Sequence, residues 1–278
     1  MRLSRAILPR TVLPETLDEL APQDPRARRS RRDLRRVNRI MGTRAILTRA
    51  LQGAMAAPAS EGKRKREHEL EHGRPVRVLE LGAGDGIVML RVARRVAASW
   101  PSVELTLLDR LALVEARTCA AYARLGWTVQ SLGLDVLEWA AAPLTAERSP
   151  PWDVIVTNLF LHHFADARLP GLLAAIAERC NVFIACEPRR AALPLIGAHL
   201  MGAIGASALT RHDAVLSVHA GFRERELSAL WPPESGRWQL QERHAGVFSH
   251  LFCAARRDAV RRAPRDAAAG DAAPCGAA

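Results

Sequence analysis

The sequence predicts an α/β protein with a doubly wound, mostly parallel sheet, and three observations support this prediction. Short runs of aliphatic and β-branched residues alternate with helical segments through the middle of the chain. The first of these runs leads into a turn with three glycines, as expected where a strand passes into a crossover helix. The last two runs are separated only by a glycine turn, which predicts an antiparallel hairpin at one edge of the sheet.

Five strand-like runs precede the hairpin, at residues 76–81, 103–108, 128–132, 154–158 and 182–186. The segment 88–98, between the first two runs, has its apolar residues on one face, which predicts a helix packed on the sheet. The hairpin strands are expected within residues 238–246 and 247–256. Parallel strands joined by such helices have right-handed crossovers and bind ligands at their carboxyl ends.

Composition divides the chain into four segments, expected at residues 1–29, 30–74, 75–257 and 258–278. The first is rich in Pro and Arg and is expected to be an irregular basic leader. The second is expected to be a helical cap and a charged linker, because apolar residues recur at helical spacing before Gly42 and a second apolar stripe follows. The third contains the predicted sheet. The fourth is expected to be a disordered tail, because it is dominated by small, polar and charged residues.

The chain is strongly basic, with a net charge of +11, but the charge is unevenly distributed. The first 70 residues hold 17 basic and 8 acidic side chains, a net charge of +9, whereas residues 71–255 hold 18 of each and are neutral. A basic arm can bind a polyanion, yet Arg and Ala are abundant throughout the chain, so the arm is weak evidence for such a partner. Nucleic acid is therefore not expected as a partner.

Cysteine usage and hydropathy indicate the cellular compartment. The five cysteines are scattered and form no C-x-x-C pair, which argues against a disulfide framework and against a zinc knuckle. The first twenty residues lack the apolar core of a signal peptide, and no stretch of 18 residues is continuously and strongly apolar. We expect a cytoplasmic protein with no transmembrane segment, and the sequence shows no metal-ligand spacing.

The sequence VLELGAGDGIVML (78–90) carries the main functional signal. Its three glycines stand where amide N–H groups and a helix dipole can face a ligand. Their spacing, G-x-G-x-G, differs from the G-x-G-x-x-G of dinucleotide-binding turns, and Glu80 stands just before them. A carboxylate repels a pyrophosphate but attracts a ligand that carries an amine and a sulfonium. Asp109, at the end of the second strand, is placed to accept hydrogen bonds from both hydroxyls of a ribose.

These features resemble the class I S-adenosylmethionine (SAM)-dependent methyltransferases. ELGAGDG (80–86) is similar to their first motif, and LTLLDR (105–110) is similar to the acidic end of their second strand. WDVIVTNLFLHHF (152–164) resembles their fourth motif as found in small-molecule enzymes of the ubiquinone- and menaquinone-methylating type. The resemblance covers residues 75–256 and implies an enzyme with SAM as cosubstrate. It also implies a Rossmann-like sheet of seven strands with an antiparallel final strand.

The resemblance further implies a set of cofactor-binding residues at the glycine turn and at the ends of the next three strands: Glu80, Gly82, Ala83, Gly84, Gly86, Asp109, Arg110, Asp135 and Asn158. Asp135 stands where the family often contacts the adenine amine. Asn158 is followed by Leu159 and Phe160, whereas methyltransferases that act on nucleic-acid bases have two prolines and an aromatic residue there. This difference argues against methylation of adenine in DNA or RNA.

The candidate catalytic residues are histidines, because a phenol with a pKa near 10 requires about 4 kcal/mol to ionise at neutral pH. His212 stands beside Asp213, whose carboxylate would raise its basicity. His163 follows the fourth strand, and because adjacent residues on a helix point about 100° apart, only one of His162 and His163 is expected to face the site. We expect His212 or His163 to act as base or acceptor anchor, or catalysis to rest on positioning alone.

The predicted function is methyl transfer, to oxygen or to carbon, with a phenolic, quinonoid or polyketide-like metabolite as acceptor. Segments 36–47 and 210–230 resemble parts of bacterial methyltransferases of secondary metabolism, which favours this class. Two other hypotheses stay open. The basic leader could recruit the enzyme to RNA or to a protein substrate, or the chain could be a SAM-binding regulator without catalytic activity.

Overall fold

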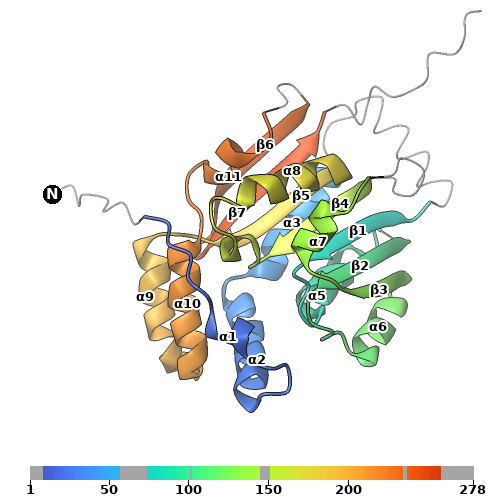
Figure 1. The fold of residues 1–278 in the computed structure, drawn as a ribbon. Coiled ribbons are helices and arrows are strands. Elements are labelled where there is room, and N and C mark those ends of the chain that lie inside the picture. The colour runs from blue at the N-terminus through green and yellow to red at the C-terminus, as the bar shows by residue number, and fades with distance from the viewer. Residues whose placement is uncertain (1–8, 57–73, 101, 145–150, 234–236, 258–278) are drawn as a thin grey trace, which may run out of the picture.

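The computed structural model describes residues 9–56, 74–100, 102–144, 151–233 and 237–257, which form one seven-stranded sheet with helices on both faces (Figure 1). The strand order is β3-β2-β1-β4-β5-β7-β6. Neighbouring strands are parallel except at β7, which runs antiparallel to both β5 and β6. The predicted fold class is confirmed, including the antiparallel final strand. The strands are β1 (Val76–Leu81), β2 (Val103–Asp109), β3 (Trp127–Gly133), β4 (Trp152–Asn158), β5 (Cys180–Pro188), β6 (Trp238–Ala245) and β7 (Ser249–Arg256).

Each face of the sheet is covered by helices that contribute to a separate apolar core. One core contains residues of α3, α5 and α6, and the other contains residues of α7, α8 and α11. The predicted stripe on α5 is buried, as expected for a crossover helix packed on parallel strands. The helices are α3 (Thr43–Ala56), α5 (Ile87–Val96), α6 (Ala116–Ala123), α7 (Val136–Ala141), α8 (Leu169–Arg179) and α11 (Glu226–Leu230).

A second group of elements gathers beyond the carboxyl ends of the strands (Figure 1). This group contains α1 (Thr16–Glu19), α2 (Pro25–Ile40), the short 3-10 helix η1 (Leu161–His163), α9 (Ala192–Leu200), η2 (Met201–Ile204) and α10 (Ala208–Ala220). Helix α2 is fastened to α10 by the buried carboxylate of Asp33, which accepts hydrogen bonds from the Ser207 amide at 2.9 Å and from the Thr210 hydroxyl at 3.2 Å. These elements enclose the region where an α/β sheet binds ligands.

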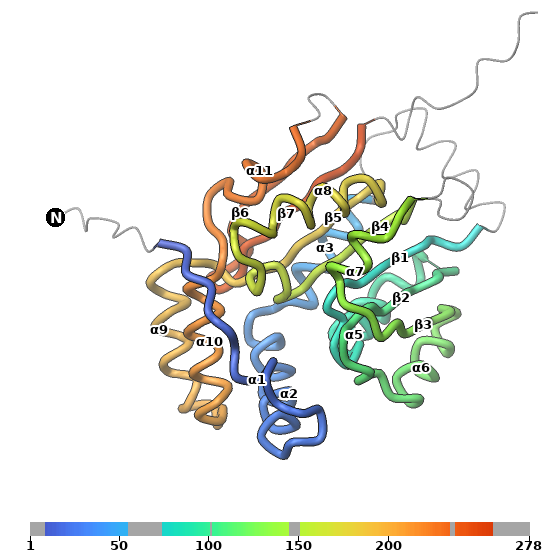
Figure 2. The backbone as a smooth tube through the Cα atoms, in the orientation of Figure 1, coloured from blue at the N-terminus to red at the C-terminus, as the bar shows by residue number. Residues whose placement is uncertain are grey.

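The N-terminal part of the chain differs from its prediction. Helix α2 begins at Pro25, with Asp24 as its N-cap, so the expected boundary at residue 29 falls inside a helix. Before α2, the leader runs alongside α10 to α1 (Figure 2), and the Thr11 amide donates to the carbonyl of His219 at 3.1 Å. Helix α3 packs on the sheet through Ile46, Leu47 and Leu51 of the predicted apolar stripe. Most of the predicted linker and all of the predicted tail lie outside the described residues.

None of the described helices combines the length and the apolar character that a membrane crossing requires.

Candidate active site

The turn between β1 and α5 has left-handed backbone at all three glycines, with φ of 69° at Gly82, 56° at Gly84 and 70° at Gly86. A Cβ atom on Gly82 would lie 2.2 Å from the Phe160 ring, and one on Gly86 would lie 2.9 Å from Leu107. A Cβ atom on Gly84 would meet nothing within 4 Å. The packing of the protein itself therefore accounts for two of the glycines, and the third faces open space.

Glu80, the acidic residue of β1 just before this turn, is 2 % exposed. Its Oε2 has no hydrogen-bond partner among the described residues. Burial, followed by the negative charges of Asp85 and Asp109, raises the pKa of Glu80 well above its usual range. A cation bound at the turn would favour the ionised carboxylate. The buried, unpaired oxygen thus fits a ligand that carries positive charge.

Two aspartates at the ends of β2 and β3 face the same region. Asp109 braces the glycine turn, because its Oδ2 accepts from the Gly84 amide at 2.8 Å and its Oδ1 accepts from the Leu111 amide at 2.9 Å. Asp135 caps α7 through a hydrogen bond from the Leu137 amide at 2.7 Å. A carboxylate can accept about four hydrogen bonds, so both side chains can also bind a ligand.

Asn158, at the end of β4, contacts a residue that the sequence analysis did not single out. Its Nδ2 donates to Oδ1 of Asn38 on α2 at 3.2 Å, while its own Oδ1 is buried without a partner in the described part of the chain. Arg110 turns toward the leader and donates to the carbonyl of Asp18 at 2.7 Å. Asn158 is thus held by α2, and Arg110 contacts α1 across the cleft.

A cavity of about 830 Å³ connects these groups. Its walls come from the glycine turn, the ends of β2 and β4, the loop before α7, helix α2 and leader residues 12–19. Seven of the nine predicted cofactor-binding residues line it, the exceptions being Glu80 and Gly86. The leader, expected from the sequence only as an irregular basic segment, therefore forms one wall of this cavity.

A second cavity, of about 350 Å³, adjoins the first and is mainly apolar. It lies among α2, α9, η2 and α10, with Phe248 and Pro188 from the edge of the sheet. The two cavities share four lining residues: Glu15, Leu17, Leu34 and Leu159. We call the place where these four residues lie the junction. A small apolar molecule in the second cavity would meet a ligand of the first cavity there.

The junction includes a strained residue, because Leu159 has a left-handed backbone with φ of 52°. The turn after it is organised by Glu187, a fully buried residue at the end of β5. The Glu187 carboxylate accepts hydrogen bonds from the amides of Phe160 at 3.1 Å, Leu161 at 3.0 Å and His162 at 3.4 Å. A single buried carboxylate thus holds the three amides that follow Leu159.

The two neighbouring histidines of η1 have different surroundings. His162 is buried between Glu187, 2.8 Å from its Nδ1, and Glu15, 3.4 Å from its Nε2, and these carboxylates raise its pKa to about 9 against the effect of burial. The ring of His163 lies against that of His162, tilted by 33° with ring centroids 4.2 Å apart, and His163 lines the larger cavity. Burial and the charge of His162 lower the pKa of His163. Of the two, only His163 lines a cavity.

The structure places the other candidate histidine elsewhere. His212 is exposed on α10 and lines neither cavity. The Asp213 carboxylate turns away from it and accepts the amides of Thr16 at 3.0 Å and Leu17 at 2.9 Å. Successive residues of a helix point in different directions, so neighbours in the sequence need not touch. The expected carboxylate–imidazole pair is absent from the described structure, and Asp213 anchors the leader instead.

Three contributors to the site were missed by the sequence analysis. Glu15 lies in a Pro-rich segment with no periodicity, Asn38 lies on a helix read only for its apolar stripe, and Glu187 ends a buried strand. For Glu187 a signal existed, since an acidic residue at the carboxyl end of a buried parallel strand faces the ligand edge. No comparable signal marks Glu15 or Asn38.

Comparison with known protein families identifies the chain. A family model described as a methyltransferase domain matches residues 18–243. The chain belongs to this family. The chain therefore contains a class I methyltransferase domain, a family whose cosubstrate is SAM, as the resemblance implied. The match includes α2 and α3 and begins within the segment that was expected to be a separate leader.

Solved structures that resemble this chain are distant in sequence. An O-methyltransferase family protein from Burkholderia thailandensis has 15% identity and a TM-score of 0.42 over 70% of this chain and 57% of its own. The mitomycin 7-O-methyltransferase has 20% identity and a TM-score of 0.48 over 86% and 60%. Magnesium protoporphyrin IX methyltransferase from Synechocystis PCC 6803 has 10% identity and a TM-score of 0.45 over 87% and 88%. The methyltransferase thus spans less than two thirds of the first two chains, and no curated protein matches it.

The raised pKa of the Glu80 carboxyl predicts that SAM binding releases a proton. The raised pKa favours the protonated carboxyl of Glu80 in the free protein, and a bound cation favours the ionised carboxylate. Because SAM binding would lower the pKa of Glu80, the affinity for SAM should increase as the pH rises toward the pKa that Glu80 has in the SAM-free protein. Calorimetry in two buffers with different ionisation enthalpies should show up to about one proton released per SAM. Glu80→Gln should abolish the release, and equal heats in both buffers for the wild type would contradict the prediction.

The position of the leader predicts a second effect on SAM binding. Arg10 anchors the leader by donating to the carbonyls of Ala220 at 2.9 Å and Phe164 at 2.8 Å and by pairing with Asp166. Arg10→Ala should free the leader and weaken SAM binding roughly tenfold, or about 1.4 kcal/mol, because one wall of the cavity would be lost. Arg26→Ala, which removes only a solvent-exposed pair with a neighbour in sequence, is the matched control. Unchanged affinity in the Arg10 variant would show that the leader does not support SAM binding.

Proposed function

We propose that the methyltransferase transfers the methyl group of SAM to the hydroxyl of a small apolar acceptor, a phenolic metabolite of quinonoid or polyketide-like type. The observation that carries this proposal is the apolar cavity that meets the larger cavity at the junction. Its volume of about 350 Å³ is at the small end of the range for ligand pockets. Its lining offers little to a highly charged substrate and favours a molecule with a broad apolar surface.

The larger cavity is the proposed SAM site, with the nine residues expected from the sequence as its binding residues. SAM supplies an electrophilic methyl group on a cationic sulfur. Asp109 and Asp135 line this cavity, where they would accept hydrogen bonds from the ribose hydroxyls and the adenine amine, and buried Glu80 would balance the positive charge near the glycine turn. Gly84 allows the ligand to approach the backbone, because no side chain occupies the space beside it.

Catalysis would rest mainly on alignment and on exclusion of water. An in-line displacement requires the acceptor oxygen, the methyl carbon and the sulfur to lie on one line, and holding this geometry supplies much of the rate acceleration. Leu17, Leu34 and Leu159 surround the junction with apolar surface, which removes water from the reacting atoms. The acceptor hydroxyl would lie beside Glu15 and His163, the polar groups that line the larger cavity at this point.

This proposal can be tested with labelled SAM and a series of phenols that carry increasing numbers of charged groups. Methyl transfer should be found for phenols with an apolar body, and it should fall when charged groups are added to that body. Ala214→Phe, which fills the apolar cavity from α10, should raise the KM for the acceptor at least about tenfold, with SAM affinity retained. Ala208→Phe, at an exposed position of the same helix, is the matched control.

Two outcomes would contradict the proposal. Label incorporated into RNA or protein in a salt-sensitive reaction, with none in phenols, would favour recruitment through basic residues. Binding of SAM without transfer to any acceptor class would favour a regulatory role. In the described part of the chain, Arg31 and Arg35 of the basic helix α2 are engaged by the protein itself, through the carbonyl of Pro22 and the carboxylate of Asp85.

A further inference from the structure

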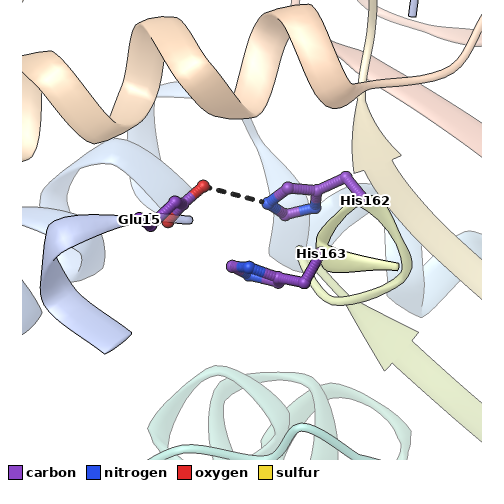
Figure 3. A group of neighbouring side chains, drawn as sticks. All are labelled: Glu15, His162 and His163. Atoms are coloured by element: carbon purple, nitrogen blue, oxygen red, sulfur yellow. Dashed lines mark ion pairs between the residues drawn. The ribbon is translucent and has the colours of Figure 1, made fainter. Parts of the chain in front are cut away.

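Three side chains from two distant parts of the sequence meet at the junction. Glu15 comes from the leader just before α1, and His162 and His163 come from η1 after β4 (Figure 3). Each offers one ligand atom, and these atoms all lie within 4.8 Å of one another. Sequence spacing alone showed no metal pattern because Glu15 approaches the histidines only when the leader folds across the sheet. Three side chains that commonly bind metal ions thus lie together in a mostly buried position.

Both histidines have a carboxylate at Nδ1. Oε2 of Glu187 lies 2.8 Å from Nδ1 of His162, and Oδ2 of Asp18 lies 3.3 Å from Nδ1 of His163. A histidine that binds a metal through one ring nitrogen almost always donates its other N–H to a carboxylate, a carbonyl or a water. With Nδ1 facing a carboxylate, Nε2 of each ring is the atom available to bind a metal ion. In Figure 3 both rings extend toward Glu15.

The distance between Glu15 and His162 also fits two ligands of one metal ion. Oε1 of Glu15 lies 3.4 Å from Nε2 of His162. A charge-assisted N–H···O hydrogen bond has its heavy atoms about 2.7–2.9 Å apart, so the observed separation is long for a direct bond. Two ligand atoms each about 2.0–2.1 Å from a tetrahedral zinc ion lie about 3.4 Å from each other. If the ring of His162 is neutral and its Nδ1 carries the proton shared with Glu187, Nε2 and Glu15 present lone pairs to each other, and a proton or a metal ion between them removes this repulsion.

We propose that Glu15, His162 and His163 bind a divalent metal ion, with zinc favoured by the two-histidine, one-carboxylate ligand set. Three protein ligands leave a fourth position open, as in catalytic rather than structural zinc sites. Glu15 and His163 line the larger cavity and Glu15 also lines the apolar cavity, so the open position would face the junction. Ser217 supports the geometry by donating its hydroxyl to Glu15.

The role of this ion rests on the proposed function. A phenol oxygen bound to the ion loses its proton to solvent more easily, because the metal stabilises the phenolate. The phenolate oxygen then forms a bond to the methyl carbon while the carbon–sulfur bond of SAM breaks, and the electron pair stays on sulfur as the neutral thioether product. In this account His163 is a metal ligand rather than the free base inferred from the sequence.

Metal binding can be measured without any acceptor. The purified full-length chain, and the same chain after chelator treatment, should be analysed for metal content and titrated with Zn²⁺ and Co²⁺. One equivalent should bind, and Co²⁺ should give the visible absorption of a four-coordinate ion. Asp18→Asn, which removes the carboxylate beside Nδ1 of His163 and also the ion pair of Asp18 with Arg110, should weaken binding roughly 10- to 100-fold. Glu15→Gln and His163→Gln should weaken it further, whereas His212→Gln, outside the cluster, should bind as the wild type does.

The outcomes separate the metal site from the proposed function. Failure of the folded wild-type chain to bind a stoichiometric ion, or equal binding in Glu15→Gln and His163→Gln, would overturn the site and leave a proton on His162 as the cation. Methyl transfer to phenols that is unaffected by chelation would overturn the role of the ion while the proposed function stands. Stoichiometric binding without transfer to any phenol would support the site and contradict the proposed function.

Discussion

Gly84→Val is expected to remove SAM binding and leave the methyltransferase folded. The added side chain would enter the larger cavity beside the carboxylate of Asp109, where a Cβ atom meets no protein atom within 4 Å. The left-handed backbone, with φ of 56°, makes any side chain cost about 1–2 kcal/mol in stability. Loss of SAM affinity should be larger, at least about 100-fold or 2.8 kcal/mol, because the side chain and the ligand compete for the same space.

A second glycine serves as the control that distinguishes the cost of backbone strain from the loss of space for SAM. Gly246, in the turn between β6 and β7, has φ of 74° and an equally open Cβ position, but it lines neither cavity. Gly246→Val should lose similar stability and bind SAM with wild-type affinity. Calorimetry for SAM and thermal unfolding for stability compare the two variants directly. If both lose SAM affinity equally, the effect comes from backbone strain and the glycine turn is not the SAM site.

Glu187→Leu should give the largest loss of stability among the substitutions considered for the site. The change leaves the amides of Phe160, Leu161 and His162 without their acceptor in a buried region, and it also leaves His162 with one carboxylate fewer. Removing one partner of a buried charged network costs about 3–5 kcal/mol, since the remaining groups stay desolvated. Urea unfolding followed by circular dichroism should therefore show a clearly lower midpoint.

The control for this prediction is Glu178→Leu on α8, because that glutamate is exposed and its ion pair with Arg179 spans 3.5 Å. Its replacement should change the free energy of unfolding by no more than about 0.5 kcal/mol. Glu187→Gln should fall between the two, because one side-chain oxygen remains as an acceptor. A loss below about 1 kcal/mol in Glu187→Leu would show that other groups, or water, satisfy the turn after β4.

The strands and the glycine turn were predictable because their signals are local. Aliphatic and β-branched runs, an amphipathic crossover helix and a Gly-linked hairpin each depend on neighbouring residues, and the structure has all of them within a few residues of the expected limits. The roles of the three glycines were less predictable. Gly82 and Gly86 are required by Phe160 and Leu107, which lie far away in the sequence.

The leader and the catalytic histidines could not be assigned in this way. Residues 9–20 have little secondary structure, and their position depends on single long-range contacts from Arg10, Glu15 and the amides bound by Asp213. The pairing of His212 with Asp213 was inferred from adjacency, whereas helix geometry points the two side chains in different directions. Long-range contacts of this kind leave no periodic pattern in the sequence.

The proposed function requires the methyl group of bound SAM to lie at the junction of the two cavities. Isotope-filtered nuclear Overhauser spectroscopy with SAM labelled with ¹³C at the methyl group tests this claim without requiring an acceptor. The account predicts contacts from the labelled methyl group to Leu17, Leu34 or Leu159, the apolar residues shared by both cavities, and no such contacts in Gly84→Val. Contacts from bound SAM only to residues remote from the junction, such as Leu113 or Leu137, would contradict it.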